Sequence, residues 1–371
     1  MDPLIENAIH NDVKEEFSED EESYETTDAQ LRKFLEERNA TIKVIGVGGG
    51  GNNTITRIAE VGVFGIETIA INTDAQDLLY TTADKKVLIG RDTCGGLGAG
   101  SDPKVGEVAA KEQEAEIKKH LRGADMVFVT GGMGGGTATG AAHVVAKIAK
   151  SMKALTIGIV TMPFSMEGKK RLENAEYGLS KLDEVVDTLI IIPNDKLLEL
   201  APDLPLQTSF KVADEILTNA VKGIAEMVTK AGLVNLDFAD IKAVMGEGGV
   251  ALIGVGESDT DNRAVEAIEK AINNPLLDVD ITGAEGAIIN VAGGPDMTLD
   301  EARTVVEIVS QRLSENAKII WGAQISDDLK NVVRAMIIVT GVHSAQIFGP
   351  NSSLSAKKIS DMENQLGIEY I

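Results

Sequence analysis

A run of glycines between residues 131 and 140 has the composition of a backbone cradle for phosphate. The run, GGMGGGTATG, follows the apolar stretch MVFVT and precedes a helical pattern that starts near Ala141. Glycine lets backbone N–H groups approach an anion closely, and the dipole at a helix N-terminus favours negative charge. The hydroxyls of Thr137 and Thr139 add side-chain donors. The run therefore predicts a loop that binds a phosphate group.

Two more glycine clusters follow other predicted strands. Gly46, Gly48 and Gly51 form a G-x-G-x-x-G after the first strand, and Asp74 lies at the end of the second, about where a ribose-binding acid would sit. Taken alone, this pattern predicts a dinucleotide enzyme. A third cluster at 95–100 follows the third strand, however. A dinucleotide domain normally uses one glycine-rich loop, whereas loops at neighbouring strand ends could together bind a triphosphate. The P-loop pattern G-x-x-x-x-G-K-[ST] does not occur in the sequence.

Two carboxylates outside the glycine loops could act on a water molecule. Asp237 and Asp240 lie three residues apart in the segment NLDFAD, after Asn235. Phosphoryl transfer to water needs mainly positioning and charge stabilisation, and the predicted strand-end loops offer no obvious water-activating group. A spacing of three puts both acids on one helix face, where they could polarise water. Asn and Asp are also typical helix caps, so the sequence alone leaves both roles open.

Short apolar stretches alternate with helical patterns in the first half of the chain. Stretches rich in β-branched residues suit strands buried on both faces, and they occur at 42–47, 68–72, 86–90, 126–130, 155–161 and 188–193. Helical spacing is found between them, at 104–122 and 168–186. This alternation predicts an α/β fold with a parallel sheet of Rossmann-like topology.

A second, α+β domain is expected after a long helix. The segment 207–230 has a helical pattern and no proline. Apolar runs follow at 250–256, 286–292, 317–323 and 335–342, and they flank helical patterns at 261–273 and 298–313. The expected division is an acidic arm at 1–39, a nucleotide-binding domain at 40–206, a linking helix at 207–231, an α+β domain at 232–348, and a flexible linker with a terminal peptide at 349–371.

Composition limits the partners that the chain can have. A formal charge of -23, from 58 acidic and 35 basic residues, argues against binding to a nucleic-acid backbone or an anionic membrane surface. Residues 1–39 hold 13 acidic and 4 basic residues, and we expect this arm to be mostly disordered. The single cysteine, Cys94, excludes an internal disulfide. The sequence shows no signal-like start and no apolar window long enough for direct membrane insertion, so we expect a cytosolic protein.

Seven motifs in order resemble the FtsZ group of the tubulin/FtsZ superfamily. GGGTATG at 134–140 is similar to the family signature GGGTGTG, and the likeness extends over about residues 42–345. The other motifs are IKVIGVGGGGNN, AINTDAQ, GLGAG, MPFSMEGKKR, IPNDKLL and NLDFAD. The resemblance implies a cytoskeletal protein that binds GTP, polymerises head to tail and hydrolyses GTP to GDP and phosphate as it assembles.

The resemblance places a nucleotide residue by residue. It implies contacts from Glu167 and Arg171 to ribose and phosphate-side groups, and from Phe210 and Asp214 to the base. A carboxylate at position 214 can accept hydrogen bonds from both the ring N–H and the exocyclic amine of guanine. The other implied nucleotide-binding residues are Gly48, Gly49, Gly50, Gly51, Asn52, Asn53, Asn72, Asp74, Ala99, Gly100, Gly134, Gly135, Gly136, Thr137, Ala138, Thr139, Gly140, Pro163 and Asn194.

One residue in the signature departs from the family pattern. Ala138 stands where the family has a middle glycine, and alanine cannot adopt left-handed backbone geometry at low cost. We expect a negative φ at this position, so that alanine is tolerated.

The resemblance also assigns roles to the acids and to the tail. In the family, the loop that contains Asn235, Asp237 and Asp240 completes the nucleotide site of the next subunit. Mg²⁺ accompanies the phosphates, although the sequence identifies no protein ligand for it. The terminal peptide 365–371, QLGIEYI, resembles the short ends of archaeal FtsZ and implies a SepF-type membrane adaptor at the mid-cell division ring. A terminal strand or a frayed end is the alternative.

Two other functional classes fit part of the sequence. A nicotinamide dehydrogenase would explain the first glycine loop, but it is disfavoured by the second and third loops and by the lack of a His-centred catalytic set among four histidines. A nucleotide-binding regulator without hydrolytic activity would keep the loops and lose the acids, whereas Asp237 and Asp240 are both present.

Overall fold

The computed structural model describes residues 40–341 of the chain. Within this range the undescribed positions are 64, 201–205, 230–233, 235–236, 247, 275, 277–280, 282–283 and 315. The expected acidic arm at 1–39, the linker and terminal peptide at 349–371, and Asn235 therefore lie outside the described residues.

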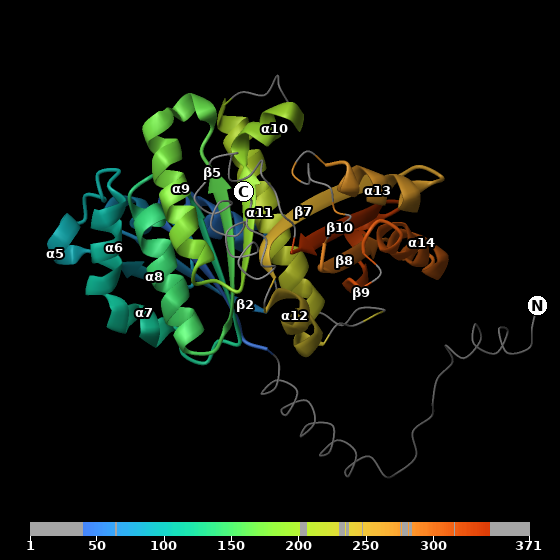
Figure 1. The fold of residues 1–371 in the computed structure, drawn as a ribbon, viewed down its shortest axis with the longest axis horizontal. Coiled ribbons are helices and arrows are strands. Elements are labelled where there is room, and N and C mark those ends of the chain that lie inside the picture. The colour runs from blue at the N-terminus through green and yellow to red at the C-terminus, as the bar shows by residue number, and fades with distance from the viewer. Residues whose placement is uncertain are drawn as a thin grey trace, which may run out of the picture. The chain divides into compact units, whose positions relative to one another are not determined.

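The described strands form a single ten-stranded sheet in the order β3-β2-β1-β4-β5-β6-β7-β10-β8-β9 (Figure 1). The strands are β1 Ile42–Val47, β2 Ile66–Asn72, β3 Lys85–Leu88, β4 Met126–Gly132, β5 Leu155–Met162, β6 Thr188–Pro193, β7 Gly249–Ser258, β8 Gly286–Gly293, β9 Lys318–Ile325 and β10 Val333–Thr340. All pairs from β3 to β7 are parallel, and only β10 runs antiparallel to its two neighbours. The predicted α/β fold with a mainly parallel sheet is confirmed.

Helices cover both faces of the parallel strands. The helices are α3 Gly48–Val61, α4 Ala75–Tyr80, α5 Arg91–Cys94, α6 Pro103–Glu112, α7 Glu114–Leu121, α8 Thr137–Ser151, α9 Lys169–Asp183, α10 Asn194–Leu200, α11 Leu206–Thr229 and α12 Phe238–Met245. Residues of α6 to α9 share one buried cluster with the sheet, and α3, α11 and α12 share another. Every residue of β1 is buried, including Lys43, whose ammonium group pairs with Glu67 and donates to the backbone carbonyl of His120.

The strand order reverses direction between β1 and β4. From β1 the chain goes through α3 to β2 on one side, and from β4 it goes through α8 to β5 on the other. At such a point the two strand-to-helix connections diverge, which opens a crevice at the carboxyl ends of the strands. The first and the signature glycine runs both lie at this position.

Helices α6 and α8 touch each other through glycine. A Cβ atom added to Gly140 would lie 1.9 Å from the carbonyl oxygen of Pro103, and one added to Gly106 would lie 2.3 Å from that of Gly136. No side chain fits at these distances, so both positions require glycine. This contact fixes the start of α8 against α6 and holds the signature loop in place.

The long helix α11 leads away from the strand ends that carry the glycine loops. Its 24 residues span about 36 Å at the usual rise of 1.5 Å per residue. The next helix, α12, ends where Thr188, the first residue of β6, donates a hydrogen bond of 2.5 Å to the carbonyl oxygen of Met245. Because Thr188 marks the amino end of a parallel strand, α12 lies toward the opposite edge of the sheet. Figure 1 shows α10 and α12 at opposite ends of α11.

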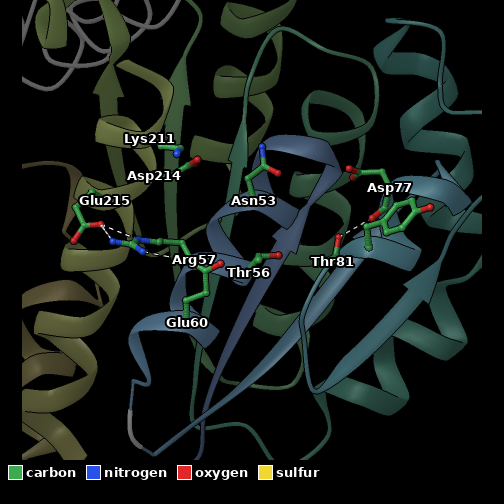
Figure 2. A pocket seen from close by; sticks show the side chains of 10 residues that line it. Asn53, Thr56, Arg57, Glu60, Asp77, Thr81, Lys211, Asp214 and Glu215 are labelled. Atoms are coloured by element: carbon green, nitrogen blue, oxygen red, sulfur yellow. Dashed lines mark hydrogen bonds and ion pairs between the residues drawn. The ribbon is translucent and has the colours of Figure 1, made fainter. Parts of the chain in front are cut away.

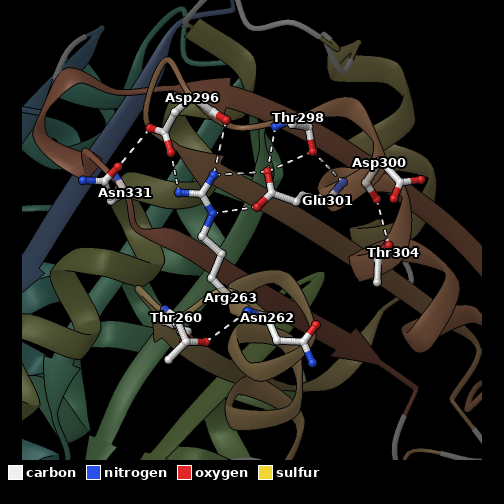
Figure 3. Close-up of polar contacts among 10 residues, drawn as sticks. Thr260, Asn262, Arg263, Asp296, Thr298, Asp300, Glu301, Thr304 and Asn331 are labelled. Carbon is white, nitrogen blue, oxygen red and sulfur yellow. Dashed lines mark hydrogen bonds and ion pairs between the residues drawn. The ribbon is translucent and has the colours of Figure 1, made fainter.

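The second half of the chain extends the same sheet and adds its own core. Strands β6 and β7 pair over three residue positions, and helices α13 Arg263–Ile272 and α14 Leu299–Ser310 pack on β7, β8 and β10. The guanidinium of Arg263 joins these helices (Figure 3). Its Nε donates to Glu301 at 2.6 Å, and it forms an ion pair with Asp296. These bonds lower the pKa of both carboxyl groups. No described helix is long and apolar enough to cross a membrane.

Candidate nucleotide-binding site

The first and the signature glycine loops lie in direct contact. A Cβ atom added to Gly48 would lie 3.0 Å from the backbone nitrogen of Ala138, and one added to Gly50 would lie 3.0 Å from that of Gly132. Neither α3 nor α8 has a side-chain hydrogen bond capping its N-terminus. Two helix N-termini with free backbone donors therefore meet at one place, which is a favourable arrangement for phosphate oxygens. Gly49, Gly51 and Asn53 lie in the first turns of α3, and Gly135 and Gly136 immediately precede α8.

Residues at the end of β2 join the two loops. The hydroxyls of Thr73 and Thr137 are 2.6 Å apart and share a hydrogen bond. Asn72 accepts hydrogen bonds from the backbone nitrogens of Thr73, at 2.8 Å, and Asp74, at 3.3 Å. The carboxylate of Asp74 caps α4 by accepting from Gln76 and Asp77, so one of its oxygens already has partners.

Asp77 is a site residue that the sequence analysis missed. Its Oδ2 atom accepts a hydrogen bond from Asn52 at 2.8 Å and another from Asn72 at 2.6 Å. An acid at the third position of a short helix gives no sequence signal for this contact. Only the fold brings it to two asparagines that lie 25 and 5 residues away.

The third glycine loop packs against the signature loop. The backbone nitrogen of Gly98 donates to the carbonyl of Thr73, and a Cβ atom on Gly136 would lie 2.9 Å from that of Ala99. Gly100 follows with a positive φ of 59°. Ala99 and Gly100 are thus brought to the same edge as the other two loops.

The segment after β5 forms another side of this edge. Gly134 has a φ of 102°, and a Cβ atom there would lie 2.9 Å from the carbonyl oxygen of Arg171 and 3.2 Å from Pro163. Glu167 pairs with Arg171 and accepts a hydrogen bond from the backbone of Phe164 at 2.9 Å. The same Glu167–Arg171 pair leaves the guanidinium half-exposed, with 49% of its side chain accessible.

Three further residues of the expected set are placed by packing. Thr139 accepts a hydrogen bond from the backbone nitrogen of Gly134 at 2.9 Å. Asn194 is 4% exposed, and its side-chain oxygen has no hydrogen-bond partner. Phe210 stacks edge to face on Phe164 with ring centroids 5.2 Å apart and remains 40% exposed.

A cavity of about 550 Å³ opens between α3, α4 and α11. It is lined by Asn53, Thr56, Arg57, Glu60, Asp77, Tyr80, Thr81, Lys211, Asp214 and Glu215, and Figure 2 shows Asn53, Asp77 and Asp214 facing it from three elements. Burial raises the pKa of Asp214 to about 6, although Thr54 donates a hydrogen bond of 3.3 Å to its carboxylate. Arg57 bonds Glu215 at 2.8 and 2.9 Å and so fastens α11 to α3.

The acids of NLDFAD are not part of this cluster within one subunit. Asp237 caps α12 by accepting a hydrogen bond of 3.4 Å from the backbone of Ala239, and Asp240 lies in the first turn of that helix. Both side chains are exposed. They lie near the far end of α11 from Asp214, at the other edge of the sheet. The capping role that the sequence left open is therefore present for Asp237.

Ala138 occupies a helical position. It is the second residue of α8, is 5% exposed, and is not among the described residues with positive φ. Its Cβ atom points toward Gly48 and Gly131, where added Cβ atoms would lie 3.3 and 3.1 Å from it. The alanine methyl group thus occupies space that these two glycines leave open, and the negative φ expected for this position is observed.

Comparison with known proteins assigns the class. The GTPase-domain model of the Tubulin/FtsZ family matches residues 41–202, and the C-terminal domain model of the FtsZ family matches residues 249–343. The cell division protein FtsZ of Methanothermobacter thermautotrophicus is 53% identical over 98% of this chain and 95% of its own. FtsZ 1 of Archaeoglobus fulgidus is 54% identical over 100% and 99%.

Solved structures agree with this assignment. An empty FtsZ dimer from M. jannaschii superposes with a TM-score of 0.82 at 56% identity, covering 87% of this chain and 93% of the other. A CetZ2 protofilament with GTPgS from Haloferax volcanii has a TM-score of 0.72 at 20% identity over 87% and 99%, which shows a shared fold. The fold and the glycine loops are thus those of a GTP-binding GTPase of the tubulin superfamily. The chain belongs to the FtsZ family.

The position of Ala138 leads to a prediction about nucleotide affinity. Ala138→Gly should change the dissociation constant for GDP by less than about threefold, because the backbone is already helical at this position. It should lower the free energy of unfolding by roughly 0.5–1 kcal/mol, the usual cost of glycine in a helix. Titration with a fluorescent GDP analogue and urea unfolding measure the two quantities.

Ala142→Gly, in the same helix but away from the loops, is the matched control for stability. A gain of tenfold or more in affinity for Ala138→Gly alone would show that alanine compromises the loop.

Proposed function

We propose that this protein is a filament-forming GTPase of the cell-division ring, whose active site is completed by the neighbouring subunit. The observation that carries the proposal is the separation between the nucleotide cluster and the two acids. The part of helix α11 from Asp214 to its end at Thr229 spans about 22 Å at 1.5 Å per residue, and the loop of Asp237 and Asp240 lies beyond that end. A head-to-tail contact would bring the acids of one subunit over the loops of the next, and such a heterologous contact generates open polymers.

Self-association is supported by the relatives. The M. jannaschii FtsZ has been solved as a dimer, and the H. volcanii CetZ2 as a protofilament. The curated relatives are named as cell division proteins, which supports a role of the polymer in cell division. Its location in the cytoplasm at the mid-cell ring is part of the proposal. We propose the same role for this chain.

The triphosphate is proposed to lie across the contact between α3 and α8. Backbone donors from the loops Gly48–Gly51 and Gly134–Gly136 would hold its β and γ groups, with the hydroxyl of Thr137 nearby. The guanine would enter the cavity between α3 and α11, where Asp214 can accept from its N–H and its amine. Glu167 and Arg171 would then face the sugar and phosphate-side groups.

Hydrolysis needs a positioned water and stabilised charge rather than a protein nucleophile. We propose that Asp237 and Asp240 of one subunit orient the attacking water over the γ-phosphate held by the next. An exposed carboxylate can accept a proton from that water or hold it by hydrogen bonds. Asn235, outside the described residues, would support the same loop.

Mg²⁺ is expected by family resemblance as the counter-ion of the phosphates. The described residues contain no group of three or more His, Cys, Asp or Glu side chains that could hold a metal ion. They do not form a protein cage for Mg²⁺, and this is compatible with a hydrated ion bound mainly through phosphate oxygens. We assign no protein ligand and no catalytic step to it.

The division of the chain is likewise a proposal. The helices α13 and α14 have a buried cluster of their own with β7, β8 and β10, which supports an α+β domain at 232–348. Helix α11 packs in the other cluster and supports the role of a linking helix at 207–231. The terminal peptide 365–371 is proposed to bind a SepF-type membrane adaptor.

An active site completed by the neighbouring subunit predicts that loss of either acid impairs GTP hydrolysis and leaves GTP binding intact. Asp237→Ala and Asp240→Ala should bind GTP within about threefold of the parent protein, because neither residue touches the nucleotide cluster of its own subunit. Their GTP turnover in assembled protein should fall by roughly 10²-fold or more, as expected for loss of a catalytic acid–base group.

Phosphate release measured over a dilution series should show activity per subunit rising with concentration in the parent protein. Activity that stays constant on dilution would contradict a site shared between subunits.

Guanine recognition by Asp214 predicts a change of base preference. In Asp214→Asn the side chain offers one acceptor and one donor, which match the N–H and the 2-oxo group of xanthine. Affinity should therefore move from GTP toward xanthosine triphosphate by roughly a hundredfold, within the usual range for hydrogen bonds to a charged group. Competition binding measures the ratio, and an unchanged preference would place the base elsewhere.

The same carboxylate predicts a pH dependence. Guanine binding requires the ionised form, and the pKa of Asp214 is about 6 in the free protein. Binding must release a proton below that pH, so GTP affinity should fall by up to about tenfold per pH unit below 6. Asp214→Asn should lose this dependence in titrations between pH 5 and 8.

The tail proposal is tested by deletion. Removal of residues 365–371 should abolish capture by an immobilised SepF-type adaptor and leave GTP-dependent sedimentation intact. Equal capture with and without the peptide would rule out this binding segment.

A further inference from the structure

The carboxylate of Asp77 lies where the phosphate loop, the end of β2 and the cavity meet. Its Oδ2 atom accepts from Asn52, the fifth residue of α3, and from Asn72, the last residue of β2. The two bonds measure 2.8 and 2.6 Å. The same oxygen is 3.8 Å from the point where a Cβ atom of Gly49 would lie. Figure 2 shows Asp77 reaching toward the cavity from the side opposite Asp214.

This geometry sets the orientation of two amide groups. A carboxylate only accepts hydrogen bonds, so both asparagines must turn their NH₂ groups toward it. The oxygen of Asn72 is then directed to the backbone nitrogens of Thr73 and Asp74. Asn52 and Asn72 are 1% and 3% exposed, so neither amide can exchange its partner for bulk water. One side chain thus ties the first phosphate loop to the end of the neighbouring strand.

The same side chain brings a negative charge to an anion site. It stabilises the empty loop, because a carboxylate near a helix N-terminus interacts favourably with the helix dipole. It opposes a bound phosphate, since like charges at a partly buried site repel each other. The two effects of Asp77 on nucleotide binding have opposite signs.

We propose that Asp77 is a positioning residue that also limits nucleotide affinity. Its hydrogen bonds hold the phosphate loop in its binding geometry, and its charge weakens the hold on phosphate and speeds nucleotide release. This inference depends on the proposed placement of the phosphates at the α3 and α8 N-termini.

Two substitutions at one position separate the effects. In Asp77→Asn the side-chain oxygen can still accept from both amides, and the charge is gone. GDP should bind about three- to tenfold more tightly and dissociate correspondingly more slowly. In Asp77→Ala both hydrogen bonds are lost, and GDP should bind about tenfold more weakly. The gain in Asp77→Asn should shrink as the salt concentration is raised from 50 mM to 1 M, because screening acts on charge and not on loop geometry.

The experiment is stopped-flow release of a fluorescent GDP analogue from the full-length protein. Glu176→Gln, on the exposed part of α9, removes the same charge away from the site and should behave like the parent protein. Thermal unfolding of each variant shows whether Asp77→Ala is folded, and the Asp77→Asn result stands without it.

Two results would overturn the inference. If Asp77→Asn weakens GDP binding, or leaves it unchanged at every salt concentration while Asp214→Asn still alters base preference, the charge has no role in release. If both Asp77 variants and Asp214→Asn leave binding unaltered, the nucleotide does not lie in this site, and the proposed placement fails together with the role of Asp77.

Discussion

The close approach of two backbone segments is the constraint on which the site depends. Helices α3 and α8 start from adjacent strands, and a Cβ atom on Gly48 or Gly50 would lie only 3.0 Å from the backbone nitrogen of Ala138 or Gly132. Where such segments converge, backbone donors from both can reach one anion, because each N–H group acts over only about 3 Å. The glycines therefore serve the geometry of the site rather than any chemistry of their own. The contact of α6 with α8 depends on glycine in the same way, because only a residue without a side chain fits at Gly140.

Much of the fold follows from local sequence. Strands β1 and β6 coincide with the apolar runs that predict them, since a strand buried on both faces is mostly apolar. The glycine-rich loops could also be predicted from the sequence, because few other roles need three or four glycines in succession. The position of Ala138 inside a helix agreed with the expectation of a negative φ. These features depend on residues that are close along the chain.

Contacts between distant residues were not visible in the sequence. Asp77 is one acid in a short helix, yet in the folded chain it accepts hydrogen bonds from two distant asparagines. Arg57 on α3 and Glu215 on α11 have no special sequence signal, yet their ion pair joins the two helices. Asp74 shows the converse case. Its sequence position suggested a ribose ligand, and the structure adds a cap of α4, in which one carboxylate oxygen accepts from the backbone of Gln76 and Asp77. The continuation of the sheet from β6 into β7 was also outside the reach of local patterns, since it joins residues about 60 positions apart.

The cavity between α3 and α11 has a consequence for how the protein stays folded. Burial of the Asp214 carboxylate raises its pKa, so its contribution to stability is present at low pH and is lost as the pH rises through about 6. A guanine bound as proposed would donate hydrogen bonds to this carboxylate and occupy part of the cavity of about 550 Å³ between α3, α4 and α11. A ligand at a hundred times its dissociation constant adds about 2.7 kcal/mol to the free energy of unfolding. The nucleotide pool of the cell is therefore part of the folding equilibrium of this chain, and a subunit that empties its pocket becomes easier to unfold.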